Sequence, residues 1–366
     1  MTSTPSGTTY ADAGVDTVAG DRAVELMKAS VARTHGPDVV GGFGGFAGLY
    51  DVSALKAFRR PLLATSTDGV GTMVAVAQAL DKHDTIGADL VGMVVDDIVV
   101  CGATPLFMTD YIACGRVVPE RMAAIVAGIA RACEEAGVAL VGGETAEHPG
   151  LLGADEYDVA GAVTGFVEAD EVLGAERVEV GDVLVAMASS GLHSNGYSLV
   201  RRVVADAGWG YDRHVDALGR TLGEELLEPT RIYARPALAT LATGGVHAMS
   251  HVTGGGLAAN LARCLPTGVT AEVDRSTWTP GAVFSLVRDL GGVPADDLER
   301  TLNLGVGMVA VVSADRAAAV VEVVERAGIP AWVCGEVRAR RPEDGESNGK
   351  GVAGGVTILR GAHQGW

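Results

Sequence analysis

The sequence has few cysteines and few basic residues for its length of 366. The five cysteines are an odd number with no Cys-x-x-Cys pair: Cys101, Cys114, Cys133, Cys264 and Cys334. They predict buried thiols in a reducing compartment, not disulfides or a zinc site. Lys and Arg number 28 against 46 Asp and Glu, a net charge of −18. Nucleic acid is therefore not expected as a partner, because phosphate backbones need clustered positive charge.

Long apolar runs and familiar nucleotide motifs are also missing. No stretch approaches the roughly 18 to 20 apolar residues of a membrane span, and residues 1–20 do not look like a secretory signal. We therefore expect a cytoplasmic protein without a membrane partner. There is no Walker A motif, no G-x-G-x-x-G after a strand and no kinase set. Any ATP site would be of another kind.

Glycine, by contrast, is abundant. The chain has 51 glycines, about twice the usual share of roughly 7 %, and they gather in loops without a period. Such loops let the backbone approach a ligand closely.

Strands and helices alternate in both halves, which predicts the α/β class with α+β layers. Strands are expected at 61–67, 106–113, 138–141, 158–167, 183–188, 246–252, 306–312 and 331–337. Helices are expected at 21–33, 72–80, 87–100, 120–136, 197–207, 228–242, 257–264 and 317–327. Residues 1–20 look irregular. A polar stretch near 168–181 predicts domains at 1–168 and 169–340, followed by a mobile tail at 341–366.

Asp68 is the first candidate site residue. It follows an apolar strand within TDGVGT (67–72). Asp is a hard oxygen ligand for Mg²⁺, and glycines let N–H groups reach phosphate oxygens. A tight turn without a ligand is the alternative. Glu144 follows Gly142 and Gly143 at a second expected strand end.

The helix at 87–100 carries further carboxylates. It is apolar nearly all round, which predicts burial, yet it contains Asp89, Asp96 and Asp97. Asp89, Gly92 and Asp96 share one stripe, whereas Asp97 points roughly 100° away. Buried carboxylates are costly unless paired or metal-bound. Asp96 and Asp97 are thus candidate metal ligands, with helix caps and salt bridges as the alternative.

Two small-residue segments could hold phosphate. Residues 189–196 precede a helix N-terminus, where free N–H groups favour anions. His193, within this segment, could polarise an oxygen, or it could simply bond to backbone. The TGGG segment (253–256), shortly after His251, is a second candidate cradle or a plain turn.

Several segments together resemble the phosphoribosylformylglycinamidine cyclo-ligase family, also called AIR synthetases. They are YADAGVD (10–16), GGFGGF (41–46), TDGVGT (67–72), DTIG (84–87), VGGETAE (141–147), DVAG (158–161), HSNGYSLV (193–200) and TGGG (253–256). The likeness runs in order to about Val337. The full 193–200 string favours this family over related selenophosphate synthetases, thiamine-monophosphate kinases and a hydrogenase maturation protein.

The resemblance implies an ATP-dependent ring closure in purine synthesis. ATP would activate the formyl oxygen of formylglycinamidine ribonucleotide, and the amidine nitrogen would close the ring of 5-aminoimidazole ribonucleotide. It also implies a two-domain fold and a homodimer whose N-terminal strands form a barrel across the interface. The domain at 1–168 would bind ATP and dimerise.

The resemblance also implies roles for single residues, with ATP and Mg²⁺ as cofactors. ATP-binding candidates are Gly41, Gly42, Gly44, Gly45, Asp68, Gly69, Gly71, Thr72, Gly143, Glu144 and Thr145. Substrate-binding candidates are Ser190, Ser194, Asn195, Gly254, Gly255 and Gly256. Catalytic candidates are His193, Asp68 and Asp97. Metal-ligand candidates are Asp68, Asp96, Asp97 and Glu144.

Three positions depart from the usual family pattern. Met73 stands where a lysine is usual, His35 and Gly36 stand where basic residues precede Pro37, and Thr104 replaces a glutamate before Pro105. Methionine cannot replace a lysine charge near phosphate. Two alternatives follow: a paralogue that uses ATP on a related amide, and an inactive nucleotide-binding dimer. The carboxylates and His193 argue against inactivity.

Overall fold

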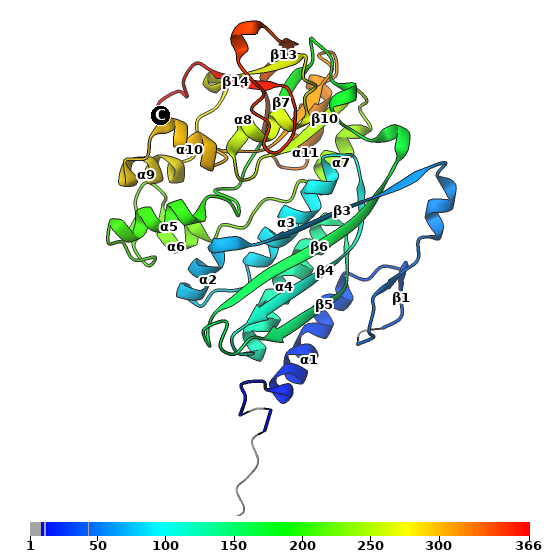
Figure 1. Ribbon diagram of the computed structural model, residues 1–366, viewed down its shortest axis with the longest axis vertical. Helices are drawn as coiled ribbons and strands as arrows, with labels where there is room; N and C mark the ends of the chain where they lie inside the picture. The colour runs from blue at the N-terminus through cyan, green and yellow to red at the C-terminus, as the bar shows by residue number, and fades with distance from the viewer. Residues whose placement is uncertain (1–8, 11, 43) are drawn as a thin grey trace, which may run out of the picture.

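The protein folds into two halves, each built on its own β-sheet (Figure 1). The computed structural model describes residues 9–10, 12–42 and 44–366. Ala11 and Phe43, which belong to segments quoted above, lie outside these residues. The first half has a four-stranded sheet in the order β3-β6-β4-β5, and the second has a six-stranded sheet in the order β10-β12-β7-β13-β11-β14. The predicted α/β class is confirmed.

The first sheet places two aspartates, Asp68 and Asp110, in one row. Its strands are β3 (Pro61–Gly69), β4 (Thr104–Cys114), β5 (Ala139–Glu147) and β6 (Tyr157–Glu168). Asp68 of β3 lies opposite Gly161 of β6, Gly161 lies opposite Asp110 of β4, and Asp110 lies opposite Gly143 of β5. Directly opposite residues share a face of the sheet. Glu144 is not at a strand end as predicted, because β5 continues alongside β4 as far as Glu147.

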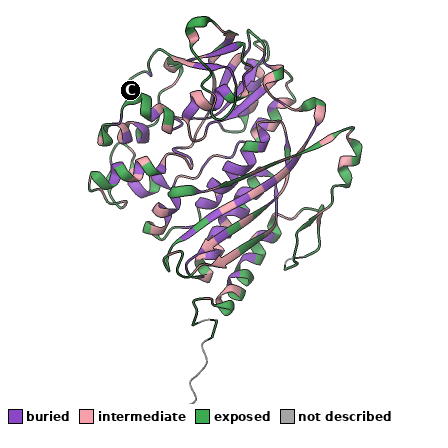
Figure 2. Ribbon diagram, viewed as in Figure 1, coloured by how far each residue is buried: buried purple, intermediate pink, exposed green. Residues whose placement is uncertain are grey.

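Helices cover one face of this sheet (Figures 1 and 2). They are α1 (Thr17–Arg33), α3 (Ile86–Val99) and α4 (Pro119–Ala136). Helices α3 and α4 pack closely at Gly87, where a Cβ would lie 2.1 Å from the Ile129 nitrogen. The prediction that 1–20 is irregular is wrong from Thr17 on, because the Asp16 carboxylate caps α1 by accepting the N–H groups of Val18 and Ala19.

In the second half, strand β12 (Val306–Val312) lies between β10 and β7, and all of its residues are buried. The other strands of its sheet are β7 (Val183–Ala188), β10 (Val246–His251), β11 (Val269–Asp274), β13 (Ala331–Ala339) and β14 (Val356–Arg360). Its helices are α5 (Tyr197–Asp206), α6 (Leu222–Leu226), α7 (Ala234–Leu241), α8 (Gly256–Leu261), α9 (Ala282–Gly291), α10 (Ala295–Thr301) and α11 (Ala317–Arg326). The remaining α-helix is α2 (Val74–Leu80). The short strands are β1 (Val39–Val40), β2 (Leu49–Tyr50), β8 (His214–Val215) and β9 (Arg220–Thr221).

Two predictions about the second half are wrong. A helix was expected over 228–242, but α7 begins only at Ala234. The residues before it stay outside a helix because the N–H groups of Thr230 and Tyr233 donate to carboxylates of α3. The segment at 341–366 was expected to be a mobile tail, yet its strand β14 pairs in parallel with β11 and completes the sheet.

No helix among the residues described is both long and apolar enough to cross a membrane. All five cysteines are free thiols, and Cys114, Cys133 and Cys334 are buried.

Candidate active site

Two carboxylates of α3 bind the backbone of the second half. Asp89 Oδ1 accepts the N–H of Thr230 at 3.1 Å and its hydroxyl at 2.5 Å. Both oxygens of Asp96 accept the N–H of Tyr233 at 3.1 Å. Both aspartates are fully buried, and this burial raises the pKa of each to about 7. Asp96, a candidate metal ligand, is therefore occupied in joining the two halves.

Asp97 faces the other way and pairs with a histidine from the second half. Its Oδ1 lies 3.0 Å from Nδ1 of His251 at the end of β10, and its Oδ2 accepts the Ser66 hydroxyl at 3.4 Å. His251 is buried, and its Nε2 has no partner among the described residues. Burial disfavours the charged ring. The Asp97 bond and the charges of Asp96, Asp97 and Asp68 outweigh burial, so the pKa of His251 is raised. The sequence had assigned no role to His251.

Asp68 lies at the end of β3, on the same side as this pair. Its side chain is exposed, and Oδ1 accepts the N–H of Gly69 at 2.8 Å. We call Asp68, Asp96, Asp97, His193 and His251 the interdomain cluster. Glu144 is not part of it. Strands lie about 4.8 Å apart, so three strand spacings separate Glu144 from Asp68 by roughly 14 Å. Within the described residues, no group of three or more His, Cys, Asp or Glu side chains is placed to hold a metal ion.

His193 is held in a strained loop before α5. Its φ is +58°, a conformation that non-glycine residues rarely adopt. The N–H of Ser190 donates to Nε2 at 3.1 Å, so the neutral ring carries its proton on Nδ1, which is buried without a partner among the described residues. Burial, then the charges of His251 and Arg231, lowers the pKa of His193 to about 3. His193 is therefore a neutral donor suited to polarise an oxygen.

Three glycine-containing turns meet beside His193. Asn195 Oδ1 accepts the N–H of Gly254 at 2.8 Å, and we call these two residues the turn pair. Thr72 and Ser198 hydroxyls lie 3.2 Å apart, which joins the TDGVGT turn to α5. The Ser194 hydroxyl lies 3.9 Å from the sulfur of Met73. The structure thus brings the 67–72, 193–200 and 253–256 segments together, as the resemblance implies.

Three of the predicted substrate ligands are constrained by the local structure. The Ser190 hydroxyl donates to the Pro229 carbonyl at 2.7 Å, which fixes the loop. Gly255 and Gly256 adopt positive φ values of +109° and +70°. A Cβ on Gly256 would lie 1.8 Å from the Glu299 carbonyl oxygen, so only glycine fits there.

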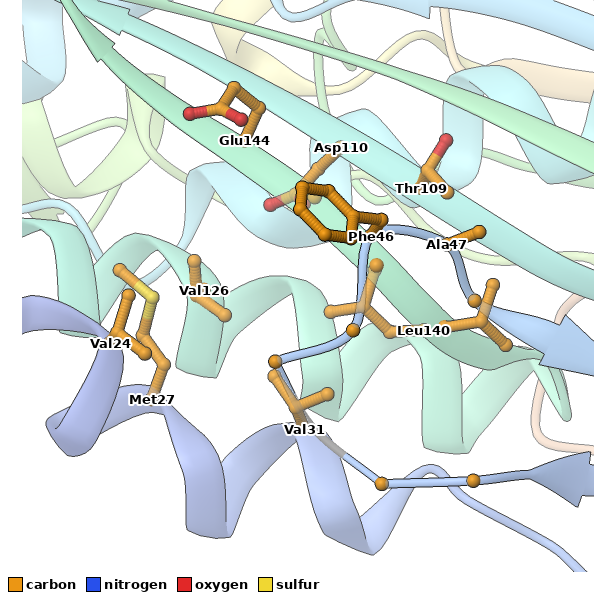
Figure 3. A pocket seen from close by; sticks show the side chains of 18 of the residues that line it. Val24, Met27, Val31, Phe46, Ala47, Thr109, Asp110, Val126, Leu140 and Glu144 are labelled. Atoms are coloured by element: carbon orange, nitrogen blue, oxygen red, sulfur yellow. The ribbon is translucent and has the colours of Figure 1, made fainter.

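A separate cavity of about 580 Å³ lies between the edge strand β5, helix α1 and the glycine loop at 41–48 (Figure 3). Predicted ATP-binding residues that line it are Gly41, Gly42, Gly44, Gly45, Gly143, Glu144 and Thr145. Val24, Met27 and Val31 of α1 form its apolar floor. We call this cavity the glycine-loop pocket. Asp68, Gly69, Gly71 and Thr72 lie at the opposite edge of the sheet, so the predicted site residues form two groups.

Asp110 is a pocket residue that the sequence reasoning missed. It projects from β4 into the pocket (Figure 3), and burial raises its pKa to about 7. A Cβ on Gly143 would lie 1.7 Å from Asp110 Oδ1, so this glycine makes room for the carboxylate. The sequence did contain a signal for Asp110, because an acidic residue inside a mostly apolar strand is unusual and indicates a functional role.

Known proteins match this chain over most of its length. It is 49 % identical over 329 residues to a phosphoribosylformylglycinamidine cyclo-ligase of Geobacillus kaustophilus, which covers 90 % of this chain and 95 % of that protein. The chain belongs to the phosphoribosylformylglycinamidine cyclo-ligase family. A second cyclo-ligase, from Thermosynechococcus vestitus, is 50 % identical over 332 residues, 90 % of this chain and 96 % of that protein. The resemblance stated from the sequence is confirmed.

Family models and solved structures agree with a cyclo-ligase fold. The N-terminal domain model of AIR synthase related protein matches residues 51–167, and the C-terminal domain model matches 179–346. Thiamine-monophosphate kinase from Stenotrophomonas maltophilia has a TM-score of 0.63 at 18 % identity, over 93 % of this chain and 96 % of that one. Hydrogenase maturation protein HypE in complex with ATP has a TM-score of 0.64 at 18 % identity, over 93 % and 91 %. These structures share the two-domain fold.

Proposed function

We propose that this protein uses ATP to cyclise formylglycinamidine ribonucleotide to 5-aminoimidazole ribonucleotide. The observation that carries the proposal is the interdomain cluster, in which a neutral His193 and an Asp97–His251 pair lie beside the turn pair. Oxygen activation by phosphorylation needs positioned charges and donors more than covalent chemistry by the protein.

The glycine-loop pocket is the proposed nucleotide site. Its apolar floor suits a base, and the backbone of the glycine loop suits phosphates. The HypE neighbour was solved with ATP, which fits the same use of this fold. Glu144 would order the nucleotide from the pocket rim, and the 41–45 loop would close over it.

The exposed carboxylates of the cluster suit Mg²⁺. This hard cation prefers oxygen ligands, and an exposed side chain is accessible to it. Asp68 and Asp97, both exposed and near His251, would hold it together with nucleotide phosphates. A bound Mg²⁺ would neutralise phosphate charge. Asp96 would stabilise the site without binding the metal, because both of its oxygens already accept the Tyr233 N–H.

The protein's own residues then divide the remaining work. Nδ1–H of His193 would donate to the formyl oxygen of the substrate and increase its polarisation. His251, whose protonated form Asp97 favours, would stabilise negative charge on the transferred group through Nε2–H. The turn pair and Ser194 would position the ribose phosphate, which fixes the amidine nitrogen for ring closure.

The assembly we propose is a cytoplasmic homodimer. The face of the first sheet opposite α3 carries exposed apolar side chains, among them Leu63 at 68 % and Tyr111 at 41 % exposure. Pairing this face with that of a second copy would bury them and form the barrel implied by the family.

A second candidate function is favoured by Met73. It is fully buried and contacts Ser194, so the charge that a lysine would bring to this turn is absent. The second candidate is ATP-dependent activation of a related amide by a paralogue.

One assay separates these functions. Purified protein is supplied with formylglycinamidine ribonucleotide, ATP and Mg²⁺, and the aminoimidazole product and ADP are measured. Both products are expected in equal amounts. ADP release only with another amide would favour the paralogue, and no ADP with any amide would favour an inactive nucleotide-binding dimer.

A further inference from the structure

Lysine is rare in this chain, and one of its four lysines lies beside the turn pair. The lysines are Lys28, Lys56, Lys82 and Lys350. Lys350 belongs to the segment between β13 and β14, which is fastened to the second half. Asn348 exchanges two hydrogen bonds with the backbone of Thr357, both at 2.9 Å. A Cβ on Gly354 would lie 2.0 Å from the Ala262 carbonyl oxygen, so the segment seats closely on the residues after α8.

Both the backbone and the side chain of Lys350 contact the turn that contains Gly254. Its N–H donates to the Ala259 carbonyl on α8 at 3.2 Å, and Nζ donates to the Gly254 carbonyl at 2.9 Å. A Cβ on Gly255 would lie 3.5 Å from Lys350 Cδ. The opposite side of Gly254 donates its N–H to Asn195. Lys350 therefore contacts one member of the turn pair, Gly254, directly.

The Lys350 ammonium is suited to bind a further anion. Its recorded contact within the described residues is a neutral carbonyl, which leaves two of its three N–H donors for a ligand. The protein carries a net charge of −18, so a phosphate needs local positive charge to approach. Met73 provides none on the other side of Ser194.

We propose that Lys350 is a substrate-binding residue whose ammonium binds the ribose phosphate of the substrate at the turn pair. The proposal rests on the proposed function and deepens it, because it assigns the positive charge that the turn containing Met73 lacks. The phosphates of ATP share this chemistry, so the test measures the two nucleotides separately.

The test compares Lys350→Met and Lys350→Arg with Lys56→Met, which removes an exposed lysine from the 3-10 turn at 53–57 that precedes β3. Lys350→Met is expected to raise the KM for formylglycinamidine ribonucleotide about tenfold, as loss of a charged hydrogen bond does, with an unchanged KM for ATP. Lys350→Arg keeps most of the affinity, and Lys56→Met matches the wild type. Lys350→Met also loses the wild-type preference for the ribonucleotide over its dephosphorylated ribonucleoside.

Binding of ribose 5-phosphate, measured by calorimetry without ATP, keeps this test independent of turnover. Weaker binding by Lys350→Met, with no weakening by Lys56→Met, supports the proposal even if the cyclisation assay fails. Equal affinity of wild type and Lys350→Met for ribose 5-phosphate would overturn it. A rise confined to the KM for ATP would also overturn it, because Lys350 would then bind the phosphates of ATP and not the ribose phosphate of the substrate.

Discussion

The Asp89 carboxylate links the two halves through the Thr230 backbone, and it does so most favourably when protonated. Its two hydrogen bonds need only one acceptor oxygen, and Oδ2 is buried without a partner among the described residues. A negative charge there has little compensation. The acidity of Asp89 is therefore a cost to the fold near neutral pH.

Replacing Asp89 by Asn should change how stability depends on pH. The pKa of Asp89 is raised to about 7 in the folded protein, while an unfolded aspartate ionises near 3.9. The stabilisation by its proton is complete below about pH 4 and is lost as the pH rises through 7. Asn keeps the acceptor and cannot ionise, so the stability of Asp89→Asn relative to wild type should rise by about 3 kcal/mol from pH 5 to pH 8. Urea unfolding at both pH values measures this gain.

The control is Asp21→Asn, which removes an exposed carboxylate from α1. Parallel pH dependences for wild type and Asp89→Asn would contradict a buried, protonated Asp89.

Replacing Asp97 by Asn should lower the pKa of His251. Asn can still contact Nδ1 but removes the largest of the stabilising contributions to the charged ring. The histidine then loses its proton at lower pH, and kcat should fall about 100-fold near pH 7, within the range for loss of a proton-donating group. NMR titration of the His251 ring and a pH profile of kcat check this. Ser66→Ala, which removes only a 3.4 Å contact, is the control; an unshifted His251 resonance in Asp97→Asn would refute the pairing.

Helical spacing placed the α3 carboxylates on two different stripes, but it did not separate their roles, because Asp96 and Asp97 were both predicted to be metal ligands. The stripe of Asp89 and Asp96 is buried and the side of Asp97 is exposed, as the 3.6-residue period predicts. His251 could not be assigned in this way. Its partner Asp97 is far away in sequence, and only the tertiary fold brings the two side chains together.

At the scale of elements, β5 carries one side of the glycine-loop pocket, and its two central glycines differ sharply. Gly143→Ala places a methyl group 1.7 Å from Asp110 Oδ1, whereas the nearest atom to a Cβ on Gly142 is Thr109 Cγ2 at 3.8 Å. Gly143→Ala should displace the Asp110 carboxylate into the pocket and raise the KM for ATP about tenfold or more, with a lower Tm. Gly142→Ala should change neither value greatly. Steady-state kinetics and thermal unfolding measure both variants; equal KM values would exclude Asp110 from the nucleotide site.

The bounds of some strands could be predicted because their own residues form a clear hydrophobic pattern. The strands at 183–188 and 306–312 have the predicted bounds, because continuous apolar runs mark buried strands. The structure of the segment at 228–233 could not be predicted. Its backbone N–H groups donate to carboxylates of the other half instead of forming hydrogen bonds within a helix. β14 was also missed, because a polar, glycine-rich stretch precedes it and its parallel partner β11 is remote in sequence.

At the scale of the whole molecule, association through the first sheet can be tested by introducing one charged residue at the proposed interface. Leu63 lies opposite Phe166 on the face away from α3. Leu63→Asp should abolish the homodimer, because it places a charge in the centre of the proposed apolar interface. Analytical ultracentrifugation should show a dimer for wild type and a monomer for the variant. Val180→Asp, which alters an exposed residue between the halves, should remain dimeric. A dimeric Leu63→Asp protein would place the interface elsewhere.

The parallel pairing of β14 with β11 also sets an order of events during synthesis on the ribosome. The first half can fold as it emerges, but β11 must wait with an open edge while α9, α10, β12, α11 and β13 are made. Only when β14 arrives does the segment carrying Lys350 reach α8. The nascent chain therefore acquires the proposed nucleotide pocket early and the proposed substrate-binding lysine last. On these proposals, a prematurely released chain would bind ATP but would lack the lysine for the molecule that ATP activates.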